Sequence, residues 1–481
     1  MQPHPFSPDH FWRNNLNEWI KSFTESFPPE SWSLEVDELN RYSQDAWPVV
    51  VKLSQIGQSP YLPEVLFRPH FPEEVPTLLK WANQHQVPVT AWGAGSGVVG
   101  AALPTKGGIL LDLSGLNKIL ILDESNLLVK VQAGMMGHHL EAELNRKGFT
   151  LNHSPQSLDR STVGGWIATR ACGQFSSRWG GIEDITLAMT VVLANGETIS
   201  TRLSPRSALG PDIKSIFIGS EGTFGVFLDA TLKICRLAET RLLETISFPS
   251  VESGLTGMRE LMQSGLRPFL LRFYDADESL FVARWSGVTP PVAAHLFFLG
   301  CEGLSDMVQS EYRAAMKILK SAGGEKLGPV IAQGWMDNRF DFSGVENRLA
   351  QPGGVAETIE VASLWDGILE TYQALKHELL PFADNVLGHF SHAYMQGASL
   401  YIILIGQASD AKAAEGRLRE IWNVAMRTSM ENGAVISHHH GIGLARQQYL
   451  RQELGSSHAI LERIKNVLDP EGILNPGKLA F

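Results

Sequence analysis

The sequence predicts an α+β protein made of two structurally different units, and three observations support this. Short strand patterns separated by glycine-rich turns fill the first half of the chain, with few long helical patterns between them. From about residue 241 onward, longer helical patterns alternate with apolar strands. The length of 481 residues also corresponds to about three units of ordinary domain size. We therefore divide the chain into residues 1–60, 61–240, 241–432 and 433–481.

The first two segments contain one predicted helix followed by an alternation of helices and strands. Apolar residues at helical spacing predict an amphipathic helix near the N-terminus: Trp12, Leu16, Trp19, Ile20 and Phe23. The patterns after it predict a helix from Pro72 to Ala82, strands at 87–92, 109–113 and 127–132, a helix at 138–146, a hairpin of 188–193 with 197–201, and a strand within 216–234. A proline opens the first of these helices, and Asn195-Gly196 is a typical hairpin turn.

The second unit is predicted to be an antiparallel sheet covered by helices. Helical patterns occur at about 251–264, 305–322, 365–380 and 409–430. Apolar strand patterns occur near 267–274, 295–300, 385–394, 399–406 and 433–437. Two helices laid on one antiparallel sheet is the simplest arrangement of such elements. The tail differs from both units, because proline and glycine punctuate its last residues.

The composition excludes several functional classes. Asp and Glu number 51 against 40 Lys and Arg, so the chain carries a net charge of −11 and is poorly suited to nucleic acid or anionic lipid. The chain has three cysteines, an odd number, and no two of them form a CxxC pair, so the sequence does not indicate a disulfide framework. The N-terminus lacks the pattern of a signal peptide, and no run of 18 apolar residues occurs. We therefore expect a cytoplasmic protein without a transmembrane segment.

Four glycine-rich turns stand out in the first unit. The first, WGAGSGVVG at 92–100, follows a predicted strand and matches GxGxxG. A dinucleotide-binding βαβ unit requires a helix directly afterwards, whereas the sequence continues as AALPTKGG. The Rossmann interpretation therefore fails, although consecutive N–H groups of such a loop can still bind a pyrophosphate. The other turns lie at 155–169, 170–184 and 219–225, and together the four favour one shared ligand over four unrelated loops.

These motifs resemble a known family. WGAGSGVVGA, STVGGWIATRACG and GSEGTFGV resemble the FAD-binding domain of the vanillyl-alcohol-oxidase (PCMH-type) flavoproteins, and LDPEGILNPGKL near the end is typical of FAD-linked oxidases. The resemblance runs from about residue 60 to the C-terminus. It implies a two-part PCMH-type FAD-binding domain at 61–240 and an antiparallel cap domain carrying the substrate site at 241–432. Residues 433–481 would return to the flavin.

The resemblance also assigns cofactor residues. It implies that the pyrophosphate is held by Gly93, Ala94, Gly95, Ser96 and Gly97. The rest of the cofactor would be lined by Ser157, Ser161, Thr162, Gly164, Gly165 and Ile182, with Glu221, Gly222 and Thr223 nearby. Some relatives attach FAD through a His or Cys of the first loop. Because residues 92–100 contain neither, we expect FAD to be bound non-covalently.

Within the family, SHHHG at 437–441 resembles the alkyldihydroxyacetonephosphate synthases, which form ether lipids from acyl-dihydroxyacetone phosphate and a fatty alcohol at flavin N5. The resemblance implies that Tyr401 is a general acid/base, that His439 and His440 relay protons, and that Arg272 binds an anionic substrate group. The Tyr401 pKa, ordinarily about 10, would have to be lowered by nearby His or Arg. From the residues alone, Arg272 also fits an ion pair with Asp275, and Tyr401 also fits a core position.

The competing branch is the metal-dependent D-2-hydroxyacid dehydrogenases, which oxidise a CH–OH group of D-lactate or glycolate. The positions of their two His ligands and one Glu ligand correspond here to Tyr394, Tyr401 and His439, so we predict no metal. The sequence departs from the synthases too, with Glu346 in place of a second substrate-binding Arg and His389 in place of another.

Arg339 or Arg348 could supply the missing cation only if the loop is shifted. His389 and His392 lie on a predicted strand near the proposed site, and their role is left open. We therefore expect a small anionic substrate, a phosphate or a carboxylate. A homodimer is the assembly under consideration.

Overall fold

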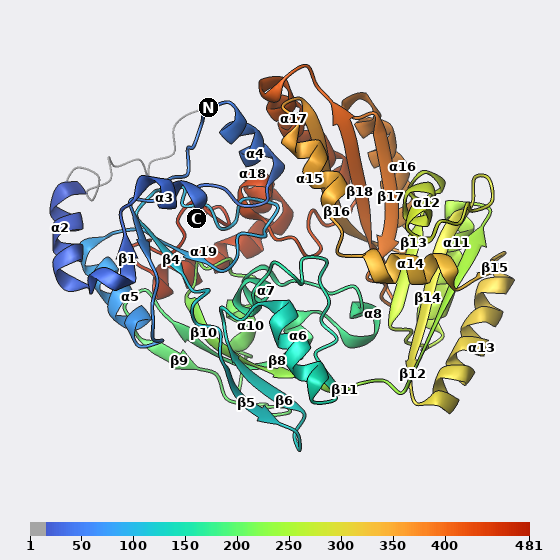
Figure 1. Cartoon of the computed structure of the whole chain (residues 1–481), viewed down its shortest axis with the longest axis horizontal. Helices are drawn as coiled ribbons and strands as arrows, with labels where there is room; N and C mark the ends of the chain where they lie inside the picture. Colours follow the sequence, from blue (N-terminus) through green and yellow to red (C-terminus); the bar gives the residue numbers. More distant parts are fainter. Residues whose placement is uncertain (1–15) are drawn as a thin grey trace.

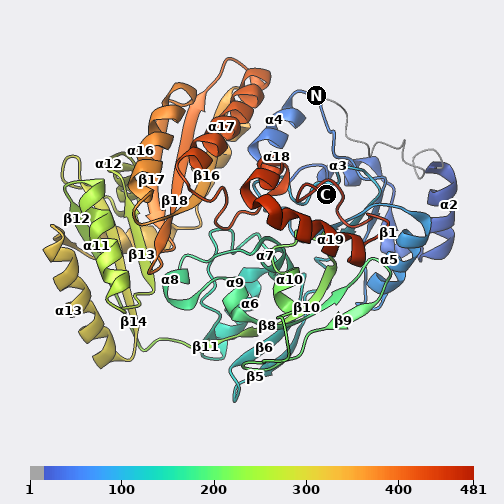
Figure 2. The same cartoon turned by 180° about the vertical axis from the view of Figure 1, so that it is seen from behind.

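The computed structural model describes residues 16–481 and places them in two lobes (Figure 1). The blue-to-green lobe comprises the first half of the chain, and the yellow-to-orange lobe comprises the second. The red C-terminal segment returns from the second lobe and lies against the first (Figure 2). The predicted N-terminal helix is α2 (Leu16–Ser26), which buries Trp19 and Phe23, while the predicted contribution of Trp12 falls outside the described residues.

The first lobe begins with a small sheet in which β2, β4 and β3 run parallel. Its strand order is β1 (Trp32–Ser33), β2 (Val65–Phe67), β4 (Ile109–Asp112) and β3 (Val89–Trp92). Every residue of β2 and β4 is buried, as is usual for parallel strands covered on both faces. The helix predicted after Pro72 is α5 (Glu74–His85), and its Trp81 packs edge-on against Phe23 of α2.

The second sheet of this lobe is antiparallel and carries the predicted hairpin. Its order is β5 (Ile119–Asp123), β6 (Leu128–Gln132), β10 (Val226–Lys233), β8 (Thr186–Val192) and β9 (Thr198–Ser200). The remaining elements of the lobe are α3 (Val36–Arg41), α4 (Pro48–Gln55), α6 (Gly137–Arg146), β7 (Phe149–Thr150), α7 (Val163–Thr169), α8 (Ser176–Trp179), α9 (Ile182–Ile185), α10 (Lys214–Phe217) and β11 (Cys235–Arg236).

The second lobe is built on a seven-stranded antiparallel sheet. Its order is β15 (Glu325–Gly328), β12 (Thr240–Phe248), β14 (His295–Gly303), β13 (Leu270–Tyr274), β17 (Asn385–Ser391), β18 (Gly397–Gln407) and β16 (Gly354–Leu364). Successive side chains of a strand point to opposite faces. Leu271, Phe273, Leu400 and Ile402 therefore belong to one core, which lies under the long helices α11 (Val251–Gln263), α13 (Ser305–Ser321), α16 (Ile368–Leu379) and α17 (Ala411–Glu431).

Two expectations for this lobe were wrong. Four long helices cover one face of the sheet, not two, because seven strands present a wider apolar face than the strands visible in the sequence. The strand predicted at 433–437 is reduced to a single bridge between Val435 and Ala362, because the chain turns there into the histidine loop. The opposite face is covered only in part, by α12 (Ala276–Ala283) and α14 (Val330–Asn338), and α15 (Ser343–Ala350) lies near the β16 edge.

The C-terminal segment joins the two lobes. It contains α18 (Gly443–Leu454) and α19 (His458–Leu468), neither of which was predicted from the sequence. Its last residues bind the edge of β3, where Val89 N–H donates to Ile473 and Asn475 N–H donates to Val89. Within residues 16–481, none of the helices is both long and apolar enough to cross a membrane.

Candidate active site

A row of buried polar side chains crosses the face of the large sheet that lies opposite the long helices. The strand register pairs Tyr274 with His389, His389 with Tyr401, and Tyr401 with Glu360, so four neighbouring strands each contribute one residue. Residues paired in this way point to the same face. Arg272 lies two residues before Tyr274 and shares that face. The sequence places these groups there because they alternate with apolar residues of the helix-covered core.

Arg272 is buried and held in a fixed orientation. Its Nε donates to Tyr274 Oη at 2.7 Å, and a terminal nitrogen lies 2.8 Å from His389 Nε2. The guanidinium also lies 5.0 Å from the Trp335 ring centroid, a cation–π distance. Asp275 pairs with Lys376 at 2.7 Å, so the alternative of a local Arg272–Asp275 ion pair is not what the structure shows.

Behind Arg272 lies a second buried pair. His389 Nδ1 lies 2.7 Å from Glu278 Oε1, and both side chains are buried. Burial raises the pKa of Glu278 to about 8 and lowers the pKa of His389 well below its ordinary value. Because burial disfavours charge on both partners, Arg272 is the main positive charge of this part of the site. Glu278 is a site residue that the sequence did not reveal.

The histidine loop is anchored by Glu360. Its carboxylate accepts backbone N–H groups from His438 at 2.5 Å, His439 at 3.2 Å and His440 at 2.9 Å. It also pairs with Arg446 at 3.0 Å, and both of these side chains are 0% exposed. Burial opposes ionisation of Glu360, but the Arg446 charge outweighs it and keeps the pKa of this carboxyl well below its usual range.

Tyr401 meets the histidine loop directly. Its Oη forms a short hydrogen bond with His440 Nε2 and lies 3.4 Å from His439 Nε2. Its ring stacks on His389, with centroids 4.8 Å apart and planes 8° apart. Tyr401 is buried like a core residue, with 9% of it exposed. Its hydroxyl nevertheless bonds two imidazoles, so the interpretation of Tyr401 as a core aromatic explains its burial and not its contacts.

The expected lowering of the Tyr401 pKa is not what the structure shows. Burial, followed by the Glu360 charge, raises the pKa of Tyr401 above its ordinary value. Burial also lowers the pKa of His439 to about 3 and that of His440 to about 4. At neutral pH the site therefore holds a phenol and neutral imidazoles.

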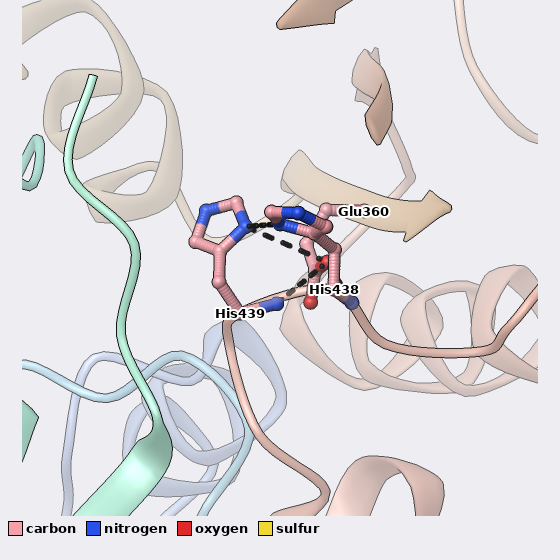
Figure 3. A group of neighbouring side chains, drawn as sticks. All are labelled: Glu360, His438 and His439. Carbon is pink, nitrogen blue, oxygen red and sulfur yellow. Dashed lines mark hydrogen bonds and ion pairs between the residues drawn. The ribbon is translucent and has the colours of Figure 1, made fainter. Parts of the chain in front are cut away.

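Glu360, His438 and His439 are close enough together to suggest a metal site. Figure 3 shows the Glu360 carboxylate beside the two imidazoles, and the three candidate ligand atoms lie within 4.8 Å of one another. Both carboxylate oxygens already accept hydrogen bonds, from the three backbone N–H groups, the Ser437 hydroxyl and Arg446. His438 Nδ1 and His439 Nδ1 are 2.8 Å apart, a hydrogen-bond distance. The candidate ligand atoms are therefore already bonded to other groups of the protein.

The glycine-rich turns lie in contact with one another. A Cβ added to Gly93 would lie 2.3 Å from Thr162 Oγ1, so the first and second turns touch. Glu221, in the fourth turn, accepts N–H groups from Ile442 and Gly443 of the segment after the histidines. The third turn joins the second through the Ala171 N–H, which donates to the Trp166 carbonyl, and the fourth joins the second through the Glu221 N–H, which donates to the Ala168 carbonyl. The turns and the histidine loop therefore form one continuous surface of backbone.

Several residues expected to line the cofactor have side chains engaged within the protein. Ser161 Oγ donates to Ser157 and accepts from Trp166 Nε1, both at 2.7 Å. Thr162 caps α7 by accepting from Gly165 N–H. Ile182 is in the core, and the Thr223 hydroxyl donates to Ser220. Their hydroxyls and apolar groups shape the turns. Gly164 packs on Ala133, to which its N–H donates, so the backbone of the first turn at Gly93–Gly97 and that of Gly222 are left to contact a ligand.

Buried polar atoms at these turns fit a polar ligand. Both ring nitrogens of His153, which packs on Trp166 of α7, lack a partner among the described residues, as do the hydroxyls of Ser154 and Ser220. A carboxylate oxygen of buried Asp45 is likewise unpaired, and it lies 3.8 Å from where a Gly97 Cβ would be. Buried groups of this kind normally have a partner, so a bound molecule with many acceptors and donors suits them.

The structure provides no substitute for the missing second arginine beside Arg272. Glu346 pairs with Arg160 at 2.6 Å, and Arg348 bonds Gln407. Arg339 lies over the Phe340 ring and donates to the Met336 carbonyl. Among the contacts of the described residues, none joins Arg339 or Arg348 to Arg272. His389 occupies the neighbouring position on the sheet as an uncharged group.

Comparison with known proteins gives a consistent result. A model of FAD binding domains matches residues 63–202, and a model of the C-terminal domain of FAD linked oxidases matches residues 237–479. The chain is 30% identical to the uncharacterized FAD-linked oxidoreductase YgcU of Escherichia coli K12, covering 85% of this chain and 87% of that protein.

Two further relatives have named activities. The chain is 27% identical to alkyldihydroxyacetonephosphate synthase of Dictyostelium discoideum, over 88% of this chain and 74% of that protein. It is also 27% identical to D-lactate dehydrogenase of Anaerostipes hadrus, over 96% and 97%. A solved alkyldihydroxyacetonephosphate synthase superimposes with a TM-score of 0.80 at 22% identity, over 99% of this chain and 86% of that one, which establishes the fold.

Proposed function

The chain belongs to the FAD-linked oxidase family and its cofactor is FAD, and on this basis we propose that it catalyses a reaction of the alkyldihydroxyacetonephosphate synthase type. The observation that carries the proposal is the hydrogen-bonded contact of Tyr401 with His439 and His440 on the face that also presents Arg272. These are the residues that the synthase resemblance assigned to proton transfer and anion binding. At the positions where the competing branch has its metal ligands, this chain has Tyr394, Tyr401 and His439, whose side chains already form hydrogen bonds within the protein.

The backbone of the four glycine-rich turns would hold FAD non-covalently. The N–H groups of Gly93–Gly97 suit the pyrophosphate, since consecutive amides in a turn form an anion-binding concavity. FAD supplies an electron-accepting, electrophilic ring to which the protein adds orientation and electrostatics. Residues from the histidine loop and from β18 (Gly397–Gln407) would border the reacting end of that ring.

The chain's own residues would act on the substrate in three ways. Arg272, fixed by Tyr274 and His389, binds an anionic group through its remaining donors. Tyr401 takes the proton of the reacting hydroxyl as it passes its own proton to an imidazole, because a free phenolate is disfavoured there. The buried apolar surroundings exclude water from the exchange.

A second candidate, oxidation of a 2-hydroxy acid, is favoured by one specific observation. Among the described residues, Arg272 is the one arginine that bonds Tyr274 and His389, and His389 itself is uncharged. One positive charge matches a carboxylate monoanion more closely than a phosphate dianion. In this reaction Tyr401 and the histidines would take the hydroxyl proton while the two electrons of the C–H bond pass to FAD.

Anaerobic mixing separates the two candidates. With acyl-dihydroxyacetone phosphate and a labelled long-chain alcohol, we expect the label to enter an ether product while absorbance near 450 nm is unchanged at the end of turnover. Loss of that absorbance with D-lactate or glycolate, without incorporation of the alcohol, would instead establish the dehydrogenase.

Flavin binding gives an independent test of the glycine turns. Gly93→Ala should weaken FAD binding about tenfold, or about 1.4 kcal/mol, because the new Cβ would collide with Thr162 Oγ1 and displace the cap of α7. Fluorescence titration of the flavin-free protein with FAD measures the change. Gly416→Ala, where the added Cβ meets open space, should leave the affinity unaltered. Equal affinities for the two variants would remove Gly93 from the cofactor site.

The cytoplasmic location and the homodimer stay predictions.

A further inference from the structure

A chain of hydrogen bonds leads from Tyr401 toward the surface of the protein. Tyr401 Oη lies 3.4 Å from His439 Nε2, and His439 Nδ1 lies 2.8 Å from His438 Nδ1. His438 Nε2 in turn lies 2.8 Å from Tyr394 Oη. Each imidazole therefore uses one ring nitrogen toward Tyr401 and the other away from it. Such an arrangement can pass a proton through a ring, because imidazole accepts at one nitrogen and donates at the other.

The outer end of this chain is exposed. Tyr394 is 37% exposed, and the next residue, Met395, is 48% exposed. Tyr394 lies in the turn between β17 and β18, where its N–H donates to the Gly397 carbonyl. Tyr401, at the inner end, is 9% exposed. The chain of contacts thus runs from buried Tyr401 to Tyr394, a partly exposed residue whose hydroxyl also lies 3.8 Å from Cys172 Sγ.

The route through His440 stops inside the protein. His440 Nε2 bonds Tyr401, but its Nδ1 is buried and has no hydrogen-bond partner among the described residues. The group nearest to that nitrogen is Glu360 Oε1 at 3.9 Å, which is already bonded to Arg446 and the His440 N–H, so no hydrogen-bonded path continues from His440. His153, which lies nearby, has no partner at either ring nitrogen and is not part of a path.

Glu360 supports charge movement along the open route. Its Oε2 lies 3.7 Å from His439 Nδ1, and its backbone hydrogen bonds fix the positions of His438 and His439. A carboxylate beside the first ring stabilises positive charge that develops there during transfer. Glu360 is therefore a positioning residue for the path and does not need to exchange a proton itself.

We propose that His439, His438 and Tyr394 form a relay that carries the proton taken up by Tyr401 out to solvent. This inference rests on the proposed function, since both candidate reactions free one proton. In the exchange reaction the bond between the dihydroxyacetone carbon and the acyloxy oxygen breaks, the alcohol oxygen forms a new bond to that carbon in place of its O–H bond, and the acyloxy group leaves as a fatty-acid carboxylate, so one proton is released. In the oxidation the hydrogen on carbon would leave with its two electrons as a hydride that FAD accepts, and the O–H proton would be released.

The proton movements of the relay balance at every link. Tyr401 gives its proton to His439 Nε2 and receives the substrate proton in return. His439 Nδ1–H passes its proton to His438 Nδ1, His438 Nε2–H passes its own to Tyr394, and Tyr394 releases one to water. No group in the path gains net charge, and the two rings exchange tautomers.

Proton release during a single turnover tests the relay. A pH-indicator dye in weakly buffered, anaerobic stopped-flow mixing of the flavin-loaded enzyme with its substrate measures the rate. Tyr394→Phe should slow proton release about tenfold or more, which is less than the effect of removing a residue that acts directly as the acid or base. The FAD content and the substrate affinity should be unchanged. Tyr449→Phe, a tyrosine of α18 (Gly443–Leu454) that bonds Asn423, is the matched control. Release at the unaltered rate in Tyr394→Phe overturns the relay while leaving the proposed function standing.

A second measurement decides the relay even if neither substrate class reacts. ¹⁵N NMR of histidine-labelled, flavin-loaded enzyme should show Nδ1–H on one of the two bonded rings, with coupling across the His439–His438 N–H···N bond that disappears in His438→Gln. Nε2–H tautomers on both rings without that coupling would overturn the relay. So would one equivalent of a tightly bound divalent metal that is lost in His438→Gln, because the two nitrogens would then be metal ligands.

Discussion

Tyr401→Phe is expected to lower turnover by about 10²–10⁴-fold, the usual contribution of a positioned general acid/base, while the protein remains yellow. The substitution removes only the hydroxyl that bonds His439 and His440. The ring stays stacked on His389, so packing and flavin binding are preserved. Steady-state turnover and absorbance near 450 nm, measured on the same preparation, separate a chemical defect from a folding defect.

Tyr372→Phe serves as the matched control for this variant. Tyr372 is a buried tyrosine that bonds Asp275 from the other face of the sheet, so its loss tests burial of a phenol without touching the histidine loop. Its turnover should stay within a few-fold of the unaltered enzyme. Unchanged turnover in Tyr401→Phe would remove Tyr401 from the chemistry and with it the assignment of the histidine pair.

Glu360→Gln is expected to lower the free energy of unfolding by about 3–5 kcal/mol, because removing one partner of a buried ion pair leaves the other charge uncompensated. The remaining charge would be Arg446, which is 0% exposed. The three N–H groups of the histidine loop would also lose their charged acceptor. Urea unfolding of the flavin-loaded protein measures the change.

Two comparisons make the Glu360 prediction specific. Glu370→Gln, an exposed glutamate of α16, should change the free energy of unfolding by about 0.5 kcal/mol or less. Adding Arg446→Met to Glu360→Gln should recover part of the loss, since no unpaired charge is then buried. A loss in Glu360→Gln no larger than that in Glu370→Gln would show that the loop does not depend on this carboxylate.

Local patterns were sufficient to predict the elements that carry the motifs. The helix after Pro72, the hairpin around Asn195-Gly196 and the strand containing Tyr401 all have clear periodicity or turn residues, and each occurs close to its predicted bounds. The FAD-linked oxidase family followed from the same motifs. Tyr401, Arg272, His439 and His440 were named from the sequence, and the structure brings them to one face of the sheet.

The groups that organise the site could not be predicted in this way. Glu360 meets the histidine loop only because β16 pairs with β18 in a particular register, which depends on residues far away in the sequence. Glu278 on α12 reaches His389 across a similar separation. Charged residues inside an apolar strand also weaken the strand pattern, and β16 was not predicted for that reason. The direction of the Tyr401 pKa was wrong because burial, which the sequence does not give, outweighs its neighbours.

The tail was underestimated for the same physical reason. Its two helices are stabilised by contacts with the first lobe, such as that of buried Lys465, which donates to the Thr223 carbonyl and also ties the segment together through the Leu474 carbonyl. Both helices are short, at 12 and 11 residues, so they depend on tertiary packing.

A crystal structure of the flavin-loaded chain tests the central claim most directly. The account predicts an isoalloxazine ring between the glycine-rich turns and the large sheet, with Tyr401 Oη and the Arg272 guanidinium on the side of the ring that is open to substrate. A ring that lies away from this sheet, or one separated from Tyr401 by other side chains, would contradict the assignment of the active site.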